Sequence, residues 1–374
     1  MIILKSNNNQ ELRQLLGEMD NLFDGFFPWL AGQYDPGLGG FYYAQSSIQD
    51  KAFIPDIEST AQSLNIIDRQ QLIGAMPAKM RNEMVHFFQQ KQNPQSGYFV
   101  DAHPAMIKDE VMVHRAINYS TGSLKKLGSK ALYPLPFVAK AAPEYVSTPD
   151  SYLAKWRSID LRNSWRGCDR LATSCTYIGQ MPESDREPFL QEAVRFLESI
   201  QDPETGLWGA GSLYVRISGT FKLHTFYSGF GIPMPNIELI YKSVLHCLRN
   251  EEATDMCYIR NPIDLLSYIQ VPLTPSEISE ILTITNNNMS KLKRADGGFS
   301  REIENSPPGP NVAQVKKGDY YPDMPEPVAL SQGLYEGDLN ASTQATLIRR
   351  QAYRLAGCIE EPLKGSSEFY EKII

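Results

Sequence analysis

Acidic residues that could exchange a proton with a ligand stand at the start of predicted helices. Asp56 and Glu58 open one such helix, and Glu336 and Asp338 lie just before another. Two carboxyl groups in different surroundings can act as general acid and general base, as in the cleavage of a glycosidic bond. An Asp in this position can instead cap its helix by accepting backbone N–H groups, and the sequence leaves both roles open. Together with His224, whose imidazole can titrate near neutral pH, these four acids are the predicted catalytic residues.

Basic residues near the middle of the chain could recognise an anionic group. Arg166, Asp169 and Arg170 stand at the spacings of three and four residues that bring side chains together on a helix. This arrangement is typical either of a local ion pair or of a guanidinium clamp for a carboxylate or phosphate. Lys222 lies two residues before His224, so these two side chains point to different faces of their helix. A histidine that only packs in the core is the alternative interpretation of His224.

Further polar and aromatic side chains near these helix starts are expected to bind the ligand. Amide and charged groups can hydrogen-bond to sugar hydroxyls, and aromatic rings can stack on a sugar face or on an isoprenoid chain. Core packing is the alternative, and the commoner role, for the aromatic members of the set. The predicted ligand-binding residues are Tyr43, Asp109, His114, Arg166, Arg170, Trp208, Lys222, Tyr258, Arg260, Asn340 and Gln344.

A zinc site is a further possibility that the sequence raises, but only half of one is present. Asp255 and Cys257 stand two residues apart at the start of a predicted helix. Zinc takes four protein ligands in structural sites, and three with a water molecule in catalytic sites. The predicted helix that begins near Asp338 holds no histidine to complete the set. We therefore expect neither a metal nor a cofactor, and the chain also has no P-loop, HExxH or GxSxG motif.

Two kinds of predicted helix alternate along the chain and must position these side chains. One kind mixes small, polar and apolar residues, whereas the other has a single apolar face. We expect the mixed helices to form an inner ring and the amphipathic helices an outer ring, which gives an all-α, (α/α)6 toroid of helical hairpins. The mixed helices are predicted at 56–68, 109–124, 163–178, 218–230, 255–269 and 338–355, and the amphipathic ones at about 9–30, 77–92, 150–158, 186–200, 236–250 and 275–294.

One domain over residues 1–374 is the predicted organisation, and no segment shows a convincing strand period. Polar side chains at the starts of the inner helices would then face a wet central cavity, because a buried charge without a partner is costly. A Pro-rich surface loop is predicted at about 303–330, where it could cap one end of that cavity.

A turn of one type recurs after the amphipathic helices. Each copy carries Asp or Asn followed by Gly, in three cases with Pro between them, and an aromatic residue follows at Phe41, Phe99, Trp208 or Phe299. Pro ends a helix, and Gly supplies the positive φ that reverses the chain. The aromatic ring is expected to pack back on the helix that it follows. Such a unit cannot bury its apolar face alone, so the recurrence predicts a repeat architecture of stacked neighbours.

The third of these turns resembles a known repeat. Phe196, Leu197, Gln201, Gly206 and Trp208 look like the QW-type repeat of terpenoid cyclases and protein prenyltransferases, whose fold is an α/α toroid. Six-hairpin glycosidases, sugar epimerases of the N-acylglucosamine type and several polysaccharide lyases share that toroid, and the opening segment 29–41 is similar to theirs. The resemblance implies a fold more than a function, because one fold can carry many activities.

The chemical hallmarks of these families are largely missing. Terpenoid cyclases of the acid-initiated class need a DxDD motif, which this chain lacks. Protein prenyltransferases bind zinc through an Asp-x-Cys pair and a distant His, and only the pair has a counterpart, in Asp255 and Cys257. The sugar epimerases place His residues on inner helices, where only His114 and His224 could serve.

The composition limits the partners that the protein can have. The 374 residues carry a formal net charge of −7, which argues against a nucleic-acid partner. No apolar run approaches the roughly 18 residues of a membrane span, and the first nine residues lack the apolar core of a signal peptide. The five cysteines form no CxxC pair, which favours reduced thiols and a cytoplasmic location.

The predicted function is that of an enzyme that binds a small, carbohydrate-like molecule or an oligosaccharide in the toroid. A glycosidase, a lyase and an epimerase would each fit the polar lining and the missing DxDD motif. A terpenoid- or prenyl-handling enzyme is the first alternative, and an apolar, aromatic cavity would favour it. The second alternative is a non-catalytic binding or scaffold protein, which scattered charges in structural pairs would favour.

Overall fold

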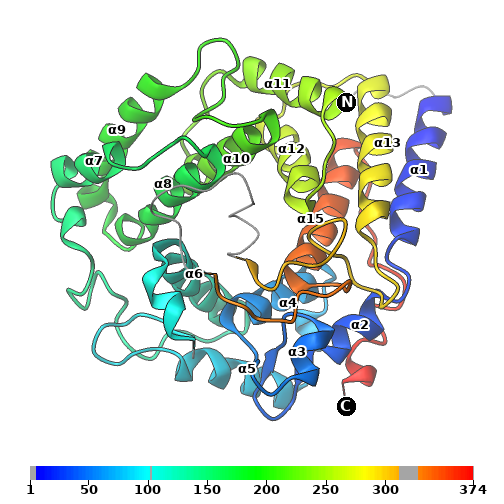
Figure 1. The fold of residues 1–374 in the computed structure, drawn as a ribbon, viewed down its shortest axis with the longest axis horizontal. Helices are drawn as coiled ribbons and strands as arrows, with labels where there is room; N and C mark the ends of the chain where they lie inside the picture. Colours follow the sequence, from blue (N-terminus) through cyan, green and yellow to red (C-terminus); the bar gives the residue numbers. More distant parts are fainter. Residues whose placement is uncertain (1–5, 102, 311–326, 374) are drawn as a thin grey trace. The chain divides into compact units, whose positions relative to one another are not determined.

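The fold is all-α, as the sequence predicts. The computed structural model describes residues 6–101, 103–310 and 327–373, and most of them are helical. Figure 1 shows the described chain as a succession of helices joined by turns. The only strand pair among the described residues is a hairpin of β1(Tyr34–Asp35) and β2(Gly40–Phe41). By its contacts the chain divides into two compact units: unit 1 comprises Met1–Arg81, Val244–Ala313 and Ala329–Ile374, and unit 2 comprises Asn82–Ser243 and Gln314–Val328.

Unit 1 is built around helix α15, which packs against two other helices. Helix α15 packs against both α4 and α12, and α1 packs against α13. Because these helices come from distant parts of the chain, polar residues from three segments meet in one unit. The elements of unit 1 are α1(Ser6–Asn21), α2(Phe26–Gly32), α3(Gln45–Gln49), α4(Ile57–Arg69), η1(Ile73–Ala75), α12(Met256–Ile269), α13(Pro275–Leu292), α15(Leu339–Leu355) and η4(Tyr370–Lys372), and α5(Ala78–Gln90) and α11(Ile237–Asn250) cross the boundary between the units.

Unit 2 is centred on helix α8, which packs against α6 on one side and α10 on the other (Figure 1). Helix α7 packs on α9. The elements of unit 2 are η2(Pro104–Lys108), α6(Glu110–Lys126), η3(Glu144–Val146), α7(Pro149–Arg157), α8(Ser164–Ile178), α9(Glu183–Ile200) and α10(Leu213–Gly229).

Each of the six helices predicted as mixed begins with a capping side chain. Asp56 accepts the backbone N–H of Ser59 at 2.8 Å, and Asp338 accepts that of Ala341 at 2.7 Å. A cap of this kind satisfies one of the N–H groups that a helix leaves without an internal partner. The other four caps are Asp109, Asn163, Ser212 and Asp255.

Two predicted helix boundaries are wrong. The helix expected from 218 begins at Leu213, so Gly219 lies inside α10 instead of opening it. A Cβ on Gly219 would lie 2.1 Å from Ser164 Oγ, so the small residues that look like a helix start allow α10 to approach α8. The single helix expected at 9–30 is split into α1 and α2, because Gly25 takes a left-handed conformation with φ of 78° between them.

The four predicted turns share one form. Gly39, Gly97, Gly206 and Gly297 all have positive φ, between 70° and 104°. In three of the turns an Asp or Asn side chain accepts the amides two and three residues on, as Asn93 does from Gln95 and Ser96. The aromatic residue that follows is buried in every copy, with at most 1% of its surface exposed. These are Phe41, Phe99, Trp208 and Phe299.

Three other predictions concern the chain as a whole. The toroidal arrangement and the single domain over 1–374 stay predictions. Most of the Pro-rich loop expected at about 303–330 falls at 311–326, which lies outside the described residues. Within the described part of the chain, no helix combines the length and the apolar character that crossing a membrane requires.

Candidate functional site

Unit 1 gathers several of the predicted residues into a buried group that we call the amide–carboxylate cluster: Glu58, Gln62, Arg301, Asn340 and Gln344. Glu58 Oε1 accepts from Gln62 Nε2 at 2.9 Å and from Asn340 Nδ2 at 3.3 Å. Asn340 Oδ1 in turn accepts from Arg301 Nη1 at 2.5 Å and from Gln344 Nε2 at 2.8 Å. No member has more than 7% of its surface exposed. The members therefore bind one another, and solvent scarcely reaches them.

Arg301 ties this cluster to two helix caps. Its Nε donates to Asp255 Oδ1 at 3.0 Å, and its backbone N–H donates to Asp338 Oδ2 at 2.8 Å. Asp338 Oδ2 also accepts from Ser306 Oγ at 2.6 Å. Burial raises the pKa of Asp338 to about 6, although these donors oppose the shift. Arg301 is not among the residues predicted from the sequence, because it follows a turn instead of starting a helix.

The remaining predicted residues of unit 1 have mainly internal partners. Glu336 accepts from the backbone N–H of Ser46 at 2.8 Å and from its hydroxyl at 2.5 Å. Arg260 lies 3.7 Å from Asp264 on the same helix. Tyr43 and Tyr258 are both buried, with 1% and 8% of their surface exposed. A catalytic role for Asp56, Glu58, Glu336 and Asp338 stays a prediction, and their geometry is that of caps and internal hydrogen bonds.

Unit 2 brings three charged side chains together from three helices, and we call them the charged triad. Arg115 Nη2 of α6 lies 2.6 Å from Asp169 Oδ2 of α8, and Lys222 Nζ of α10 lies 3.2 Å from the same oxygen. Burial opposes ionisation of Asp169, but the charges of Arg115, Lys222 and Arg166 outweigh it and lower its pKa to about 2. Asp169 is therefore an anion near neutral pH, and the side chains of Arg115 and Lys222 are 12% and 18% exposed.

A second set of ion pairs surrounds the two acids at the start of α6. Arg166 Nη2 is 2.6 Å from Asp109 Oδ1, which also caps α6. Glu110 Oε2 lies 3.2 Å from Lys155 Nζ and 3.6 Å from Arg170 Nη2. The predicted anion-binding residues thus meet in one unit, and their charges are directed at carboxylates of the chain itself.

His114 and Trp208 have core-like surroundings, whereas His224 is half-buried. His114 is 1% exposed and meets the ring of Tyr177 edge-on, at 5.0 Å between centroids. Burial lowers its pKa to about 4, although nearby Glu110 opposes the shift. His224 Nδ1 lies 3.1 Å from a carbonyl of its own helix. Trp208 is fully buried and donates from Nε1 to a backbone carbonyl at 2.8 Å.

A cavity of about 520 Å³ lies along α6, α8 and α10, and we call it the three-helix cavity. Each helix contributes a polar side chain to it, and amide groups and aromatic rings complete the lining. The sequence does not single out these positions, because none of them lies at the start of one of the mixed helices. Its lining residues are Ile117, Asn118, Thr121, Leu135, Ala172, Cys175, Thr176, Gly179, Gln180, Arg186, Thr225, Phe226, Gly229 and Phe230.

The three-helix cavity begins one helical turn beyond the charged triad. On α8, the lining residues Ala172 and Thr176 follow Asp169 by three and seven residues, and on α10, Thr225 and Gly229 follow Lys222 by the same steps. Asn118 follows Arg115 by three on α6. Residues at these spacings share one face of a helix. The triad therefore borders the cavity on all three helices.

The hydroxyl groups of the cavity are held in fixed orientations. Thr121 Oγ1 donates to the carbonyl of Ile117 at 2.8 Å, and Thr225 Oγ1 donates to that of Lys222 at 2.6 Å. Thr176 Oγ1 accepts from Asn118 Nδ2 at 2.9 Å. Because Thr121 and Thr225 each use their one proton in this way, their oxygen lone pairs are what they can offer to a ligand.

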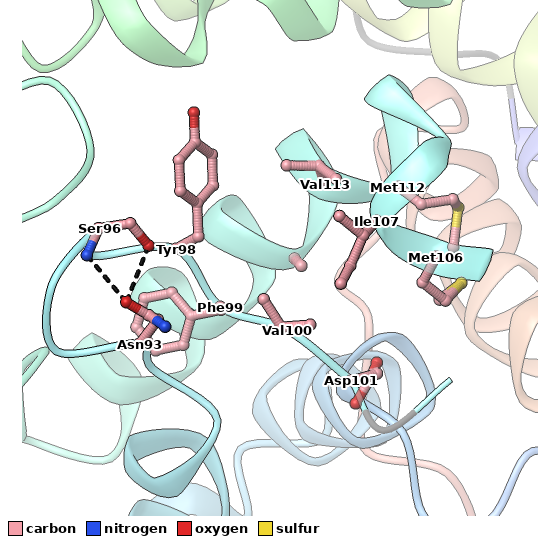
Figure 2. Close-up of a pocket in the computed structure, with 11 residues that line it drawn as sticks. Asn93, Ser96, Tyr98, Phe99, Val100, Asp101, Met106, Ile107, Met112 and Val113 are labelled. Atoms are coloured by element: carbon pink, nitrogen blue, oxygen red, sulfur yellow. Dashed lines mark hydrogen bonds between the residues drawn. The ribbon is translucent and has the colours of Figure 1, made fainter. Parts of the chain in front are cut away.

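A smaller cavity of about 340 Å³ also lies in unit 2 and is mainly apolar. Figure 2 shows the rings of Tyr98 and Phe99 on the side of the turn, and the aliphatic side chains of η2 and α6 on the other. Asp101 is the one charged residue in its lining, and Lys91 Nζ lies 2.7 Å from its carboxylate. The aliphatic side chains are Met106, Ile107, Met112 and Val113.

The residues that the structure describes include no group of three His, Cys, Asp or Glu side chains placed to hold a metal ion. Asp255 Oδ1 accepts the backbone N–H of Cys257 at 2.7 Å, so the spacing that resembles half a zinc site is that of a helix cap. Comparison with the models of known protein families found no match, and comparison with curated protein sequences found none either.

Proposed function

We propose that this protein binds a polyhydroxylated, carbohydrate-like ligand in the three-helix cavity of unit 2. The observation that carries the proposal is the lining, which combines threonine hydroxyls, amides and phenyl rings on the helix faces that carry the charged triad. A volume of about 520 Å³ falls within the range of roughly 300–1,000 Å³ that is usual for small-molecule sites. The proposal does not depend on the predicted toroid, because the whole cavity belongs to one unit.

The lining suits a sugar in three ways. The oxygens of Thr121 and Thr225 can accept hydrogen bonds from ligand hydroxyls, because each threonine proton is already donated to its own helix. The ring of Phe230 offers a surface for the apolar face of a pyranose. At the border, Lys222, whose side chain is 18% exposed, can donate to a hydroxyl.

The proposal also extends to the class of reaction that the protein would catalyse. A glycosidase, a lyase and an epimerase all need proton transfer. Cys175 is a titratable group in the lining itself, and the ion pair of Lys222 and Asp169 lies one helical turn away on the same helix faces. Because the pKa of Asp169 is lowered to about 2 and its side chain is only 2% exposed, Asp169 would hold Lys222 in place instead of donating a proton. Conversion of a bound sugar, followed by NMR, separates an enzyme from a protein that only binds.

The proposal is tested by calorimetric titration of neutral hexoses, N-acetylhexosamines and hexuronates into the purified chain. Thr121→Val removes one cavity hydroxyl at nearly constant volume, and we expect a loss of affinity of about 2- to 10-fold. Thr283→Val in α13 of unit 1 is the matched control, because its hydroxyl makes the same bond four residues back, at 2.8 Å. Failure of every sugar class to bind, or equal affinity in Thr121→Val and the wild type, would contradict the proposal.

The smaller, apolar cavity favours a second candidate, a terpenoid- or prenyl-handling function. Its two aromatic rings and two methionines form an adaptable apolar lining. Farnesol is a suitable probe, and Met112→Gln should weaken its binding, whereas Thr121→Val should not. Binding of farnesol without binding of any sugar would replace the first proposal with this one.

A further inference from the structure

We infer that the ligand of the three-helix cavity carries a carboxylate, and that Arg186 recognises it. The inference rests on the proposed function and narrows it from a carbohydrate-like ligand to a sugar acid. Arg186 lies in the first turn of α9 and is the only charged side chain among the cavity-lining residues. The lining contains no Asp or Glu, so its formal charge is positive.

The guanidinium of Arg186 is held at the cavity by an aromatic ring. Its central carbon lies 5.7 Å from the centroid of Phe230, a distance at which a cation is attracted to the face of a ring. Arg186 is partly buried, so solvent screens its charge less than that of a fully exposed side chain. Both residues line the same cavity, and the ring can therefore support the ligand and the guanidinium together.

The carboxylates nearest to Arg186 along the chain have other partners. Asp185 accepts from Ser184 Oγ at 3.0 Å, and Glu187 accepts from Gln191 Nε2 at 3.1 Å. Among the residues that the structure describes, none has a carboxylate within 4.0 Å of the Arg186 guanidinium. This differs from Arg115 and Arg166, which lie 2.6 Å from carboxylates of their own chain. Arg186 is accordingly the arginine of this region whose charge is directed at a ligand.

The polarity of the nearby helices favours a carboxylate over a phosphate. Guanidinium is planar and can pair with either group through two parallel hydrogen bonds, so its own geometry does not decide between them. The cavity lies toward the C-terminal ends of α8 and α10, at Gly179 and Gly229, where the helix dipole places partial negative charge. That charge opposes a dianionic phosphate more strongly than a singly charged carboxylate.

The test compares matched neutral and acidic sugars: glucose with glucuronate, galactose with galacturonate, and glucose 6-phosphate as the phosphate probe. In calorimetric titrations of the whole chain, we expect the better-binding acid to exceed its neutral partner by about tenfold or more, as charge-assisted hydrogen bonds allow. Arg186→Met should remove that preference and leave the affinity for the neutral sugar within about twofold. Arg195→Met is the control, because Arg195 lies on the same helix, is 66% exposed and does not line the cavity.

The outcomes separate this inference from the proposed function. Equal affinity for acid and neutral sugar in the wild type, or a preference for the acid that survives in Arg186→Met, would contradict the inference that Arg186 recognises a carboxylate. Neither result would contradict the proposed sugar site. Tighter binding of glucose 6-phosphate than of either uronate also overturns it. Absence of binding by all five compounds overturns both.

Discussion

The two units place similar charged side chains in different surroundings. In each, helices open with capped N-termini, and charged side chains from several helices meet. In unit 1 the amide–carboxylate cluster is closed, and every member is at most 7% exposed. In unit 2 the carboxylate of the charged triad is 2% exposed, but its two cations are partly exposed and a cavity begins one helical turn further on. Charged residues at helix starts are therefore not enough to identify a ligand site, because a ligand must also be able to reach them.

Close backbone packing explains why unit 1 has no such opening at this point. A Cβ on Gly298 would lie 2.9 Å from the Cα of Gly337, so the segments that precede Arg301 and Asn340 touch through their main chains. Burial of charge is costly unless hydrogen bonds replace water. The cluster supplies those bonds through Arg301 and Asn340, which makes it a structural feature of the unit 1 core.

The largest effect is expected from Arg301→Met in unit 1. This change leaves Asp255 buried without its guanidinium partner, and we expect the free energy of unfolding to fall by about 3–5 kcal/mol. Urea denaturation measures the loss. Arg195→Met on the exposed face of α9 is the control and should change stability by less than about 0.5 kcal/mol. A loss below about 1 kcal/mol for Arg301→Met would mean that the cluster does not hold unit 1 together.

Acidification should change the stability contributions of one buried group in each unit in opposite directions. The folded-state pKa of His114, about 4, lies below its ordinary 6.5, so the stability that the neutral ring contributes is lost as the pH falls from about 6.5 to 4. The folded-state pKa of Asp338, about 6, lies above its ordinary 3.8, so its contribution is present below about pH 4 and is lost as the pH rises to about 6. Each effect should reach about 2–3 kcal/mol.

Single variants separate these two contributions. Urea denaturation between pH 4 and 7 should show that His114→Gln removes a loss of stability on acidification, whereas Asp338→Asn removes a gain. The same dependence on pH in both variants as in the wild type would contradict the assignment of opposite signs to these two groups.

A smaller effect is expected when the charged triad is broken. Asp169→Asn removes the carboxylate between Arg115 and Lys222, but these cations are 12% and 18% exposed and can turn toward water. We expect a loss of about 1–2 kcal/mol, less than for Arg301→Met. If thermal and urea denaturation showed equal losses for the two variants, the triad would be as closed as the cluster in unit 1.

The smallest effect on stability is expected from filling the three-helix cavity. A Cβ on Gly229 meets no atom within 4 Å, so Gly229→Leu should fold normally and gain up to about 1 kcal/mol from the lost flexibility of glycine. The leucine side chain should nevertheless abolish sugar binding in calorimetry. Retained binding in a variant of unchanged stability would exclude this cavity as the ligand site.

The sequence predicts the helices well because their starts carry local signals. Asp56, Asp109, Asp255 and Asp338 each mark the residue before a helix, and the structure shows each of them as its cap. The run of small residues around Gly219 wrongly predicts a helix start, because close packing of α10 on α8 needs the same residue type as a helix start.

Only part of the candidate site could be predicted from the sequence, because the rest depends on how distant segments pack together. Asp169 and Lys222 could be selected as charges on helices, but their meeting with Arg115 depends on how three distant segments pack. Thr121 and Thr225 are ordinary helical residues in the sequence, and only the cavity beside them makes them candidates. Likewise, only the structure shows that the predicted acids of unit 1 are buried and hydrogen-bonded within the chain.

Hydrogen exchange of the backbone amides, with and without saturating glucuronate, tests most directly whether the ligand site lies in unit 2. A ligand slows exchange where it stabilises the folded state locally. We predict slower exchange in α6, α8 and α10 and no change in α4, α12 and α15. Protection confined to α4, α12 and α15 would contradict the account and return the ligand site to the buried cluster of unit 1.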